Sequence, residues 1–188
     1  LRREETMNLE LIFTHPEAGA QPDATGRAIR TITDFDGKLW FGYGNWQINS
    51  GPIAIRWLDP SNGTSTVDRF LDTEQIAVYK EYGNRLYALA IDPHLGVEDF
   101  AYKDTGGQWW GVKSPFNFLH VFDLVVRDQD IWLFGAINPD NAVAFHGVEN
   151  TNVGGYTWTL TDPLHLNLTG TNKSNGFNRF YFGATYGD

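Results

Sequence analysis

Short runs of β-branched and aromatic residues, separated by polar turns rich in Gly, Asn and Asp, dominate the hydrophobic pattern of the chain. Runs of this length and composition predict β-strands rather than helices. The stretch after position 119 is the clearest case, with strands expected at His120–Val126, Ile131–Ala136, Ala142–Val148 and Tyr156–Thr161. Further strands are expected at Thr66–Leu71 and Gln108–Val112. The pattern therefore predicts an all-β fold.

One short pattern recurs along the chain: a turn, then a β-favouring run with an aromatic residue near its start. Its four copies are Asp36–Gly42, Gly83–Leu89, Gln129–Gly135 and Phe177–Gly183. Their aromatic residues are Trp40, Tyr87, Trp132 and Tyr181, which by subtraction lie 47, 45 and 49 residues apart. Such a period indicates a repeated supersecondary unit.

Hairpin turns recur in step with these aromatic residues. They are expected at Asp59–Thr64, Asp104–Gly107 and Asn152–Gly155, where Gly and Asn supply the positive φ that tight turns need. Each unit is then four antiparallel strands, which is the blade of a β-propeller. A β-sandwich with accidental periodicity is the alternative.

Two segments resemble known families. Val153–Trp158 and, less well, Thr105–Trp110 resemble a degenerate form of the Asp-box hairpin of sialidase-type propellers, Asp-Gly-Gly-x-Thr-Trp. That hairpin is structural, so the resemblance implies the fold and not an activity. Gly42–Ile53 is similar to a segment in predicted propeller proteins of bacteriophages, some assigned to tails. This second resemblance implies a virion protein that recognises a host surface or builds the tail, with a virion or extracellular location; a cytoplasmic one stays open.

The repeats organise the chain into one propeller domain of about four blades, 8–188, after a flexible lead, 1–7, in which Met7 is a candidate start. The expected units are 28–72, 73–115, 116–163, and 164–188 together with 8–16. Asn8–Thr14 is expected to pair with Phe180–Ala184 and so close the last blade, which removes two open sheet edges. One strand is then missing, so the last blade is three-stranded or the chain is part of a larger ring.

Composition narrows the function classes. The net charge of −9 argues against a nucleic-acid partner, and the lack of Cys removes disulfides and thiolate metal sites. The apolar runs are too short to insert in a membrane.

Repeat register predicts which distant loops share one face of the propeller. The candidate ligand-binding residues on that face are Tyr43, Asn45, Trp46, Gln47, Asn49, Asp92, His94, Asn138, Asp140, Asn141 and Tyr186. Exposed aromatic rings beside amides and carboxylates suit a sugar, because rings stack on its apolar face while polar groups bond its hydroxyls. Simple turn formation is the alternative for each loop. The partner is therefore a cell-surface glycan or another virion protein, and a homo-oligomer stays open.

The sequence gives weaker support to a metal site or a catalytic site. Asp92, Asp140 and Asp188 occupy equivalent positions and suit Ca²⁺, but no calcium-loop spacing exists, and no other cofactor is expected. His120 and His146 are expected as structural residues within strands. Catalytic motifs are absent, Glu98 and Glu149 have no partner evident from the sequence, and the arginines beside turns are expected to be solvated. The prediction is a non-catalytic binding or assembly module; a sialidase-like glycoside-processing enzyme and a purely structural docking subunit are the alternatives.

Overall fold

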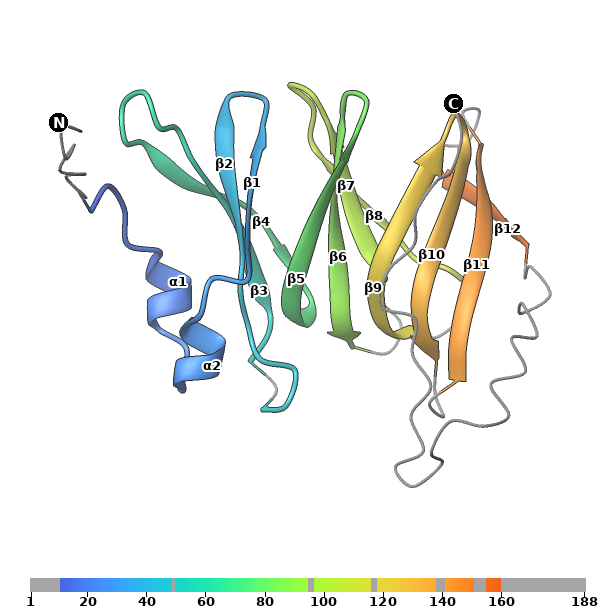
Figure 1. Ribbon diagram of the computed structural model, residues 1–188, viewed down its shortest axis with the longest axis horizontal. Helices are drawn as coiled ribbons and strands as arrows, with labels where there is room; N and C mark the ends of the chain where they lie inside the picture. The colour runs from blue at the N-terminus through green and yellow to red at the C-terminus, as the bar shows by residue number, and fades with distance from the viewer. Residues whose placement is uncertain are drawn as a thin grey trace, which may run out of the picture.

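The computed structural model describes residues 11–48, 50–94, 97–115, 118–137, 141–150 and 155–159, which form an all-β structure with two short helices (Figure 1). The helices are α1 (Pro16–Gly19) and α2 (Ala24–Arg27). The first meander comprises β1 (Thr31–Phe35), β2 (Lys38–Gly42), β3 (Ile53–Leu58) and β4 (Ser65–Leu71). The second comprises β5 (Thr73–Tyr82), β6 (Arg85–Pro93), β7 (Phe100–Asp104) and β8 (Trp109–Val112). The third comprises β9 (Phe118–Arg127), β10 (Asp130–Ile137), β11 (Asn141–Asn150) and β12 (Gly155–Thr159).

Within each meander, every strand pairs antiparallel with the next one along the chain. The prediction of an all-β fold with antiparallel strands is confirmed. The expected strands at Thr66–Leu71 and Gln108–Val112 correspond to β4 and β8, and the four expected after position 119 correspond to β9–β12. Residues 160 and 161, the end of the last of these strands, lie outside the described residues.

The first three copies of the repeated pattern span the hairpin between the first and second strand of a meander. Residues with positive φ form these turns: Asp36 and Gly37 at 55° and 67°, Gly83 at 62° and Asp128 at 56°. Glycine, and aspartate more readily than most residues, adopt this conformation, so the local sequence alone suffices to turn the chain. The fourth copy, Phe177–Gly183, lies outside the described residues.

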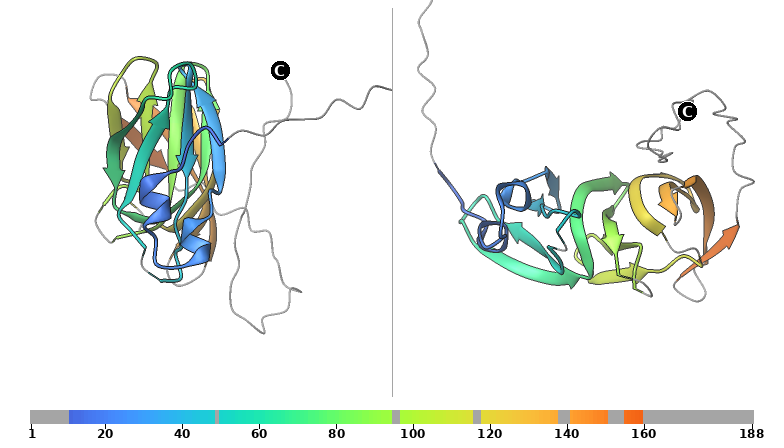
Figure 2. Two further views of the ribbon diagram at one scale, coloured as in Figure 1. Left: turned by 90° about the vertical axis from the view of Figure 1, so that its left-hand side faces the viewer. Right: turned by 90° about the horizontal axis from the view of Figure 1, so that it is seen from below.

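The core consists of two layers, each between successive meanders (Figure 2). Trp40 of the first meander is fully buried, and its ring meets that of Trp109 of the second edge-to-face, with centroids 5.5 Å apart. Tyr87 of the second meander is buried in the layer that contains Leu124 of the third. Two of the recurring aromatic residues therefore lie between one meander and the next.

Neighbouring meanders are also joined through their backbones at equivalent positions. Gly44, just after β2, forms an isolated bridge with Gln75 of β5, and Ile91 of β6 pairs with His120 of β9. Gly44 and Ile91 each lie four residues beyond a recurring aromatic residue, at 44 − 40 and 91 − 87. The second joint merges the second and third meanders into one curled sheet.

The N-terminal segment differs from the prediction of a closing strand. Leu11–Thr14 contains no strand, and residues 8–10 and 180–184 lie outside the described residues. Pro16 stands in the first turn of α1, and the Nδ1 atom of His15 accepts a hydrogen bond from the backbone N–H of Ala18 at 3.1 Å. The proline at the helix start and the capping side chain therefore end the extended course of the chain at His15.

The segment instead packs against one side of the first meander. The rings of Phe13 and His15 lie 5.3 Å and 5.6 Å from that of Phe41, and Glu17 accepts two hydrogen bonds from Arg56 at 2.7 Å and 2.8 Å. Beside them is an apolar cavity of about 230 Å³. We call the side of the first meander formed by Ile32, Leu39, Phe41 and Leu58 the open apolar face, because it is uncovered at Ile32, which is 59% exposed, although Phe41 and Leu58 are buried.

The two ends of the meanders carry different connections (Figure 1). We call the end with the turns at 36–37, 83–84 and 128–129 the hairpin end, and the end with the connections 43–52, 94–99 and 113–117 the loop end. Within the described part of the chain, no helix has the length and apolar character needed to cross a membrane.

Candidate functional site

The loop end holds those residues singled out by the sequence that the structure describes, and its first connection, 43–52, is held by hydrogen bonds. The side-chain amide of Asn45 donates to Asp23 at 2.9 Å, and its backbone N–H donates to the hydroxyl of Ser50 at 2.7 Å. The Ser50 hydroxyl donates to the carbonyl of Glu74, whose carboxylate accepts the N–H of Gly51 at 2.9 Å. Asn45 is 3% exposed, so its amide holds the loop and is not available to a ligand.

Tyr43 does not lie on the surface, and the prediction of an exposed aromatic side chain there is wrong. It is 1% exposed, and its hydroxyl accepts a hydrogen bond from the backbone N–H of Ala54 at 3.0 Å. Burial raises the pKa of Tyr43 to about 12. The residue therefore packs the core of the first meander, because the chain after β2 continues inward to pair with Gln75 rather than leaving the sheet.

Trp46 and Gln47 are the predicted ligand-binding residues of this loop that are exposed. The Trp46 side chain is 37% exposed, and its ring meets that of His120 edge-to-face with centroids 5.5 Å apart. The backbone N–H of Gln47 donates to the side-chain oxygen of Asn45 at 3.1 Å. This hydrogen bond fixes the backbone from which the Gln47 side chain extends. The loop thus holds an indole ring in one place at the joint between the second and third meanders.

His94 lies at the same end and is bound to the start of the second meander. Its Nδ1 atom pairs with Asp72, and its Nε2 atom lies 3.3 Å from the carboxylate of Glu74. The hydrogen bond with Asp72 raises the pKa of the His94 side chain. Glu74 contacts both the first loop and His94, so two of the predicted loops do meet around one buried carboxylate.

The other predicted residues are placed only in part. Asp92 lies in β6 with a φ of 57°. Asn49, Asn138, Asp140, Tyr186 and Asp188 lie outside the described residues, as does the side chain of Asn141. No group of three or more His, Asp or Glu side chains that could hold a metal ion occurs in the described ranges, and the Ca²⁺ hypothesis depends on residues beyond them.

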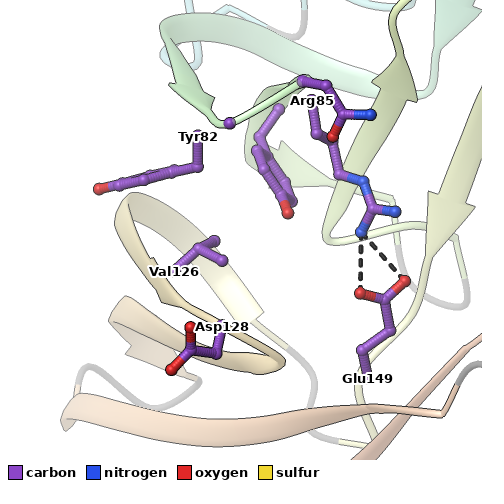
Figure 3. A pocket seen from close by; sticks show the side chains of 8 residues that line it. Tyr82, Arg85, Val126, Asp128 and Glu149 are labelled. Atoms are coloured by element: carbon purple, nitrogen blue, oxygen red, sulfur yellow. Dashed lines mark hydrogen bonds and ion pairs between the residues drawn. The ribbon is translucent and has the colours of Figure 1, made fainter.

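A cavity of about 340 Å³ lies at the hairpin end, between the second and third meanders, and the sequence did not predict it (Figure 3). We call it the hairpin pocket. The lining residues are Tyr82, Gly83, Asn84, Arg85, Tyr87, Val126, Asp128 and Glu149. Both hairpin turns that border it come from the repeated pattern, and Glu149 reaches it from β11.

Arg85 is the centre of the contacts around this pocket. Its Nε atom donates to Asp104 at 2.7 Å, and its Nη1 atom donates to both carboxylate oxygens of Glu149 at 3.1 Å. The guanidinium carbon lies 4.3 Å from the ring centroid of Tyr102. Nη1 also donates to the hydroxyl of Tyr156 at 3.4 Å, and burial raises the pKa of that phenol.

The expectation of a solvated arginine beside a turn is therefore wrong at Arg85, and Glu98 and Glu149 both have partners that the sequence did not reveal. Arg85 binds Glu149, Arg69 binds Glu98, and Arg56 binds Glu17. Each pair joins segments far apart in the chain, so no local spacing could reveal it. The one sequence signal was the recurrence of the hairpins, which places Arg85 just after a turn.

The arginines also bear on the sialidase-like alternative, which requires several guanidinium groups directed at one anion. Among the described residues, Arg56, Arg69 and Arg85 each bind a different carboxylate at a different part of the fold. These three side chains do not converge.

His120 and His146 lie within strands β9 and β11, and the ring of His146 stacks on that of Trp132 with centroids 4.4 Å apart.

Comparison with known proteins assigns the chain to no family. No model of a known protein family matches the chain, and no curated protein sequence matches it either.

Proposed function

We propose that the chain is a non-catalytic binding module of the β-propeller type, with about four blades, that recognises a host-surface glycan as part of a virion. Three consecutive four-stranded meanders support the propeller, since such meanders are its blades. The equivalent joints at Gly44–Gln75 and Ile91–His120 support it further, because a propeller repeats one blade-to-blade contact around its axis.

The open apolar face supports a further blade beside the first meander. Ile29 and Ile32 are 39% and 59% exposed there, next to an apolar cavity. In the first two meanders the recurring aromatic residue is buried by the next unit, whereas Trp132 of the third is only half-buried. We propose that the unit containing the fourth copy, Phe177–Gly183, covers these two surfaces.

The observation that carries the binding proposal is the half-exposed ring of Trp46 on a loop held by Asn45 and Glu74. An aromatic ring that is already fixed can stack on a sugar at little cost in conformational entropy. Gln47 adds an exposed side-chain amide at the same end. The virion context rests on the similarity of Gly42–Ile53 to phage propeller segments, and a virion protein partner is the other ligand class it suggests.

A glycan array tests the proposal. The wild-type protein is expected to bind a restricted set of bacterial surface glycans, and Trp46→Ala is expected to abolish that binding. Trp110→Ala is the matched control, because Trp110 is a 50% exposed tryptophan on β8. An array without any signal, or equal loss in both variants, contradicts glycan recognition at the loop end and favours the docking subunit. Hydrolysis of a labelled bound glycan would contradict the non-catalytic part.

A further inference from the structure

The hairpin pocket is a second concave site, at the opposite end of the meanders from Trp46, and it stands independently of the proposed function. Figure 3 shows Tyr82, Val126 and Asp128 on one side of it and Arg85 with Glu149 on the other. Its volume of about 340 Å³ is at the lower end of the range for pockets that bind small molecules. The question is which ligand its walls would accept.

Charge argues against an anion. Two carboxylates, Asp128 and Glu149, line the pocket with a single guanidinium, that of Arg85. Arg85 is already neutralised, because it donates to Asp104 as well as to Glu149. An incoming carboxylate or phosphate would have to displace one of these partners and would meet the remaining negative charge. The pocket therefore favours a cation.

The pocket also presents hydrogen-bond acceptors that the fold does not use. Asp128 is exposed in the β9–β10 turn, and within the described residues its carboxylate has no hydrogen-bond or ion-pair partner. The same holds for the side-chain amide of Asn84, in the β5–β6 turn. Two uncommitted side chains, from two different meanders, thus border one cavity.

The wall between these acceptors is aromatic and rigid. The hydroxyl of Tyr82 donates to the carbonyl of Leu124 at 3.0 Å, which ties the ring to the third meander. Tyr87 is 2% exposed and forms part of the floor. A tyrosine ring attracts a cation through its quadrupole, and a fixed ring adds no ordering cost on binding.

We propose that the hairpin pocket binds the primary ammonium group of a small organic amine, with Asp128 as its carboxylate acceptor and Tyr82 as its aromatic wall. An N–H-bearing cation fits better than a quaternary one, because the Asp128 carboxylate and the side-chain oxygen of Asn84 accept no hydrogen bond from the described residues. A lysine side chain and an amino sugar share this chemistry.

Titration followed by amide NMR of the full chain tests the proposal, with n-butylammonium and its neutral analogue 1-butanol as probes. Butylammonium is expected to shift the resonances of Asn84, Arg85 and Asp128 with a Kd of about 1 mM, whereas butanol leaves them unchanged. Equal shifts with butanol, or no shift at about 50 mM butylammonium, overturn the proposal.

Substitution of the uncommitted carboxylate provides the second arm. Asp128→Asn keeps a residue that tolerates positive φ and is expected to weaken butylammonium binding about tenfold. Asp36→Asn is the matched control, because Asp36 occupies the corresponding β1–β2 turn with a φ of 55°. An unchanged Kd in Asp128→Asn, or the same loss in both variants, contradicts the assignment.

The source of the ammonium group is resolved by two further pairs of probes. Glucosamine is compared with N-acetylglucosamine, and Nα-acetyl-lysine amide with its Nε-acetylated form. Tighter binding of glucosamine identifies an amino sugar as the ligand class, and tighter binding of the lysine derivative identifies a protein side chain. Binding that survives acetylation of the amine in both pairs contradicts the proposal.

Discussion

The Nη1 atom of Arg85 in the second meander donates to both carboxylate oxygens of Glu149 in the third, at 3.1 Å each, although the two residues are 64 positions apart. Their side chains are 18% and 22% exposed. The pair connects the two meanders at the hairpin end, and the backbone pair Ile91–His120 connects them nearer the loop end. It thus bears on both stability and the shape of the hairpin pocket.

Glu149→Gln is expected to destabilise the protein by about 1–2 kcal/mol, between the values for exposed and fully buried ion pairs. The glutamine keeps one acceptor oxygen but leaves part of the Arg85 charge without its partner. Urea unfolding measures the loss as a lower midpoint at unchanged m. Asp128→Asn, which removes a neighbouring carboxylate, is expected to change the midpoint little, and an equal loss there would assign the effect to overall charge.

Gly44→Ala is expected to cost about 3 kcal/mol or more, since a Cβ atom there adds strain and a backbone clash. Gly44 has a φ of 115°, and a Cβ atom would lie 2.4 Å from the carbonyl oxygen of Glu74. Gly63 has a φ of 73° and open space around it, so Gly63→Ala isolates the conformational strain at about 1 kcal/mol. Equal unfolding midpoints for the two variants would show that the Gly44–Gln75 joint is not close-packed.

The docking of the N-terminal segment is expected to weaken as the pH falls from 6.5 to 4. His15 is 6% exposed, and its burial lowers the pKa from 6.5 to about 4. In this window the undocked histidine binds a proton that the docked one does not, so acid favours the undocked form by up to about 3 kcal/mol. Hydrogen exchange of the Ala18 amide, corrected for its intrinsic pH dependence, measures the change.

His15→Asn is the control for this pH dependence. Asparagine can still accept the Ala18 N–H as a cap but does not titrate. The variant is expected to show a flat corrected exchange rate between pH 6.5 and 4. The same pH dependence in both proteins would place its origin elsewhere, for example at Glu17, whose pKa the hydrogen bonds with Arg56 lower.

Ile32→Lys tests whether the open apolar face is covered by another part of the chain. A covered lysine is expected to cost more than about 2 kcal/mol, whereas an exposed one costs within about 0.5 kcal/mol. Trp110→Lys is the control, because Trp110 is 50% exposed on β8 of the second meander and so does not belong to this face. Equal small effects contradict a covering blade. An Ile32→Lys loss that grows with protein concentration assigns the cover to a second copy of the chain.

The strands and hairpins could be predicted because their causes are local. Apolar runs such as Ile131–Ala136 bury one or both sides of a strand, and residues such as Gly83 turn the chain by their own conformational preference. The helices α1 and α2 were missed because four residues carry too little periodicity to be seen. The predicted closing strand, Asn8–Thr14, is not formed at Leu11–Thr14, where Phe13 packs on Phe41 instead, and the rest of the predicted pairing lies outside the described residues.

The candidate site likewise has features that could be predicted from the sequence and features that could not. Sequence register placed Trp46 and His94 at one end of the molecule, because repeats of similar length bring equivalent loops together. It did not separate exposed Trp46 from buried Tyr43, which depends on the inward course of the chain to the Gly44–Gln75 bridge.

The sequence by itself determined the all-β class, the meander strands that were expected and the turns between them, since each depends on neighbours along the chain. Only the tertiary structure decided that Arg85 meets Glu149, that the hairpin pocket exists, and that Asn45 and Tyr43 are buried. These features arise where separate meanders pack together. The energy of such contacts depends on three-dimensional distance and burial, which separation along the chain does not specify.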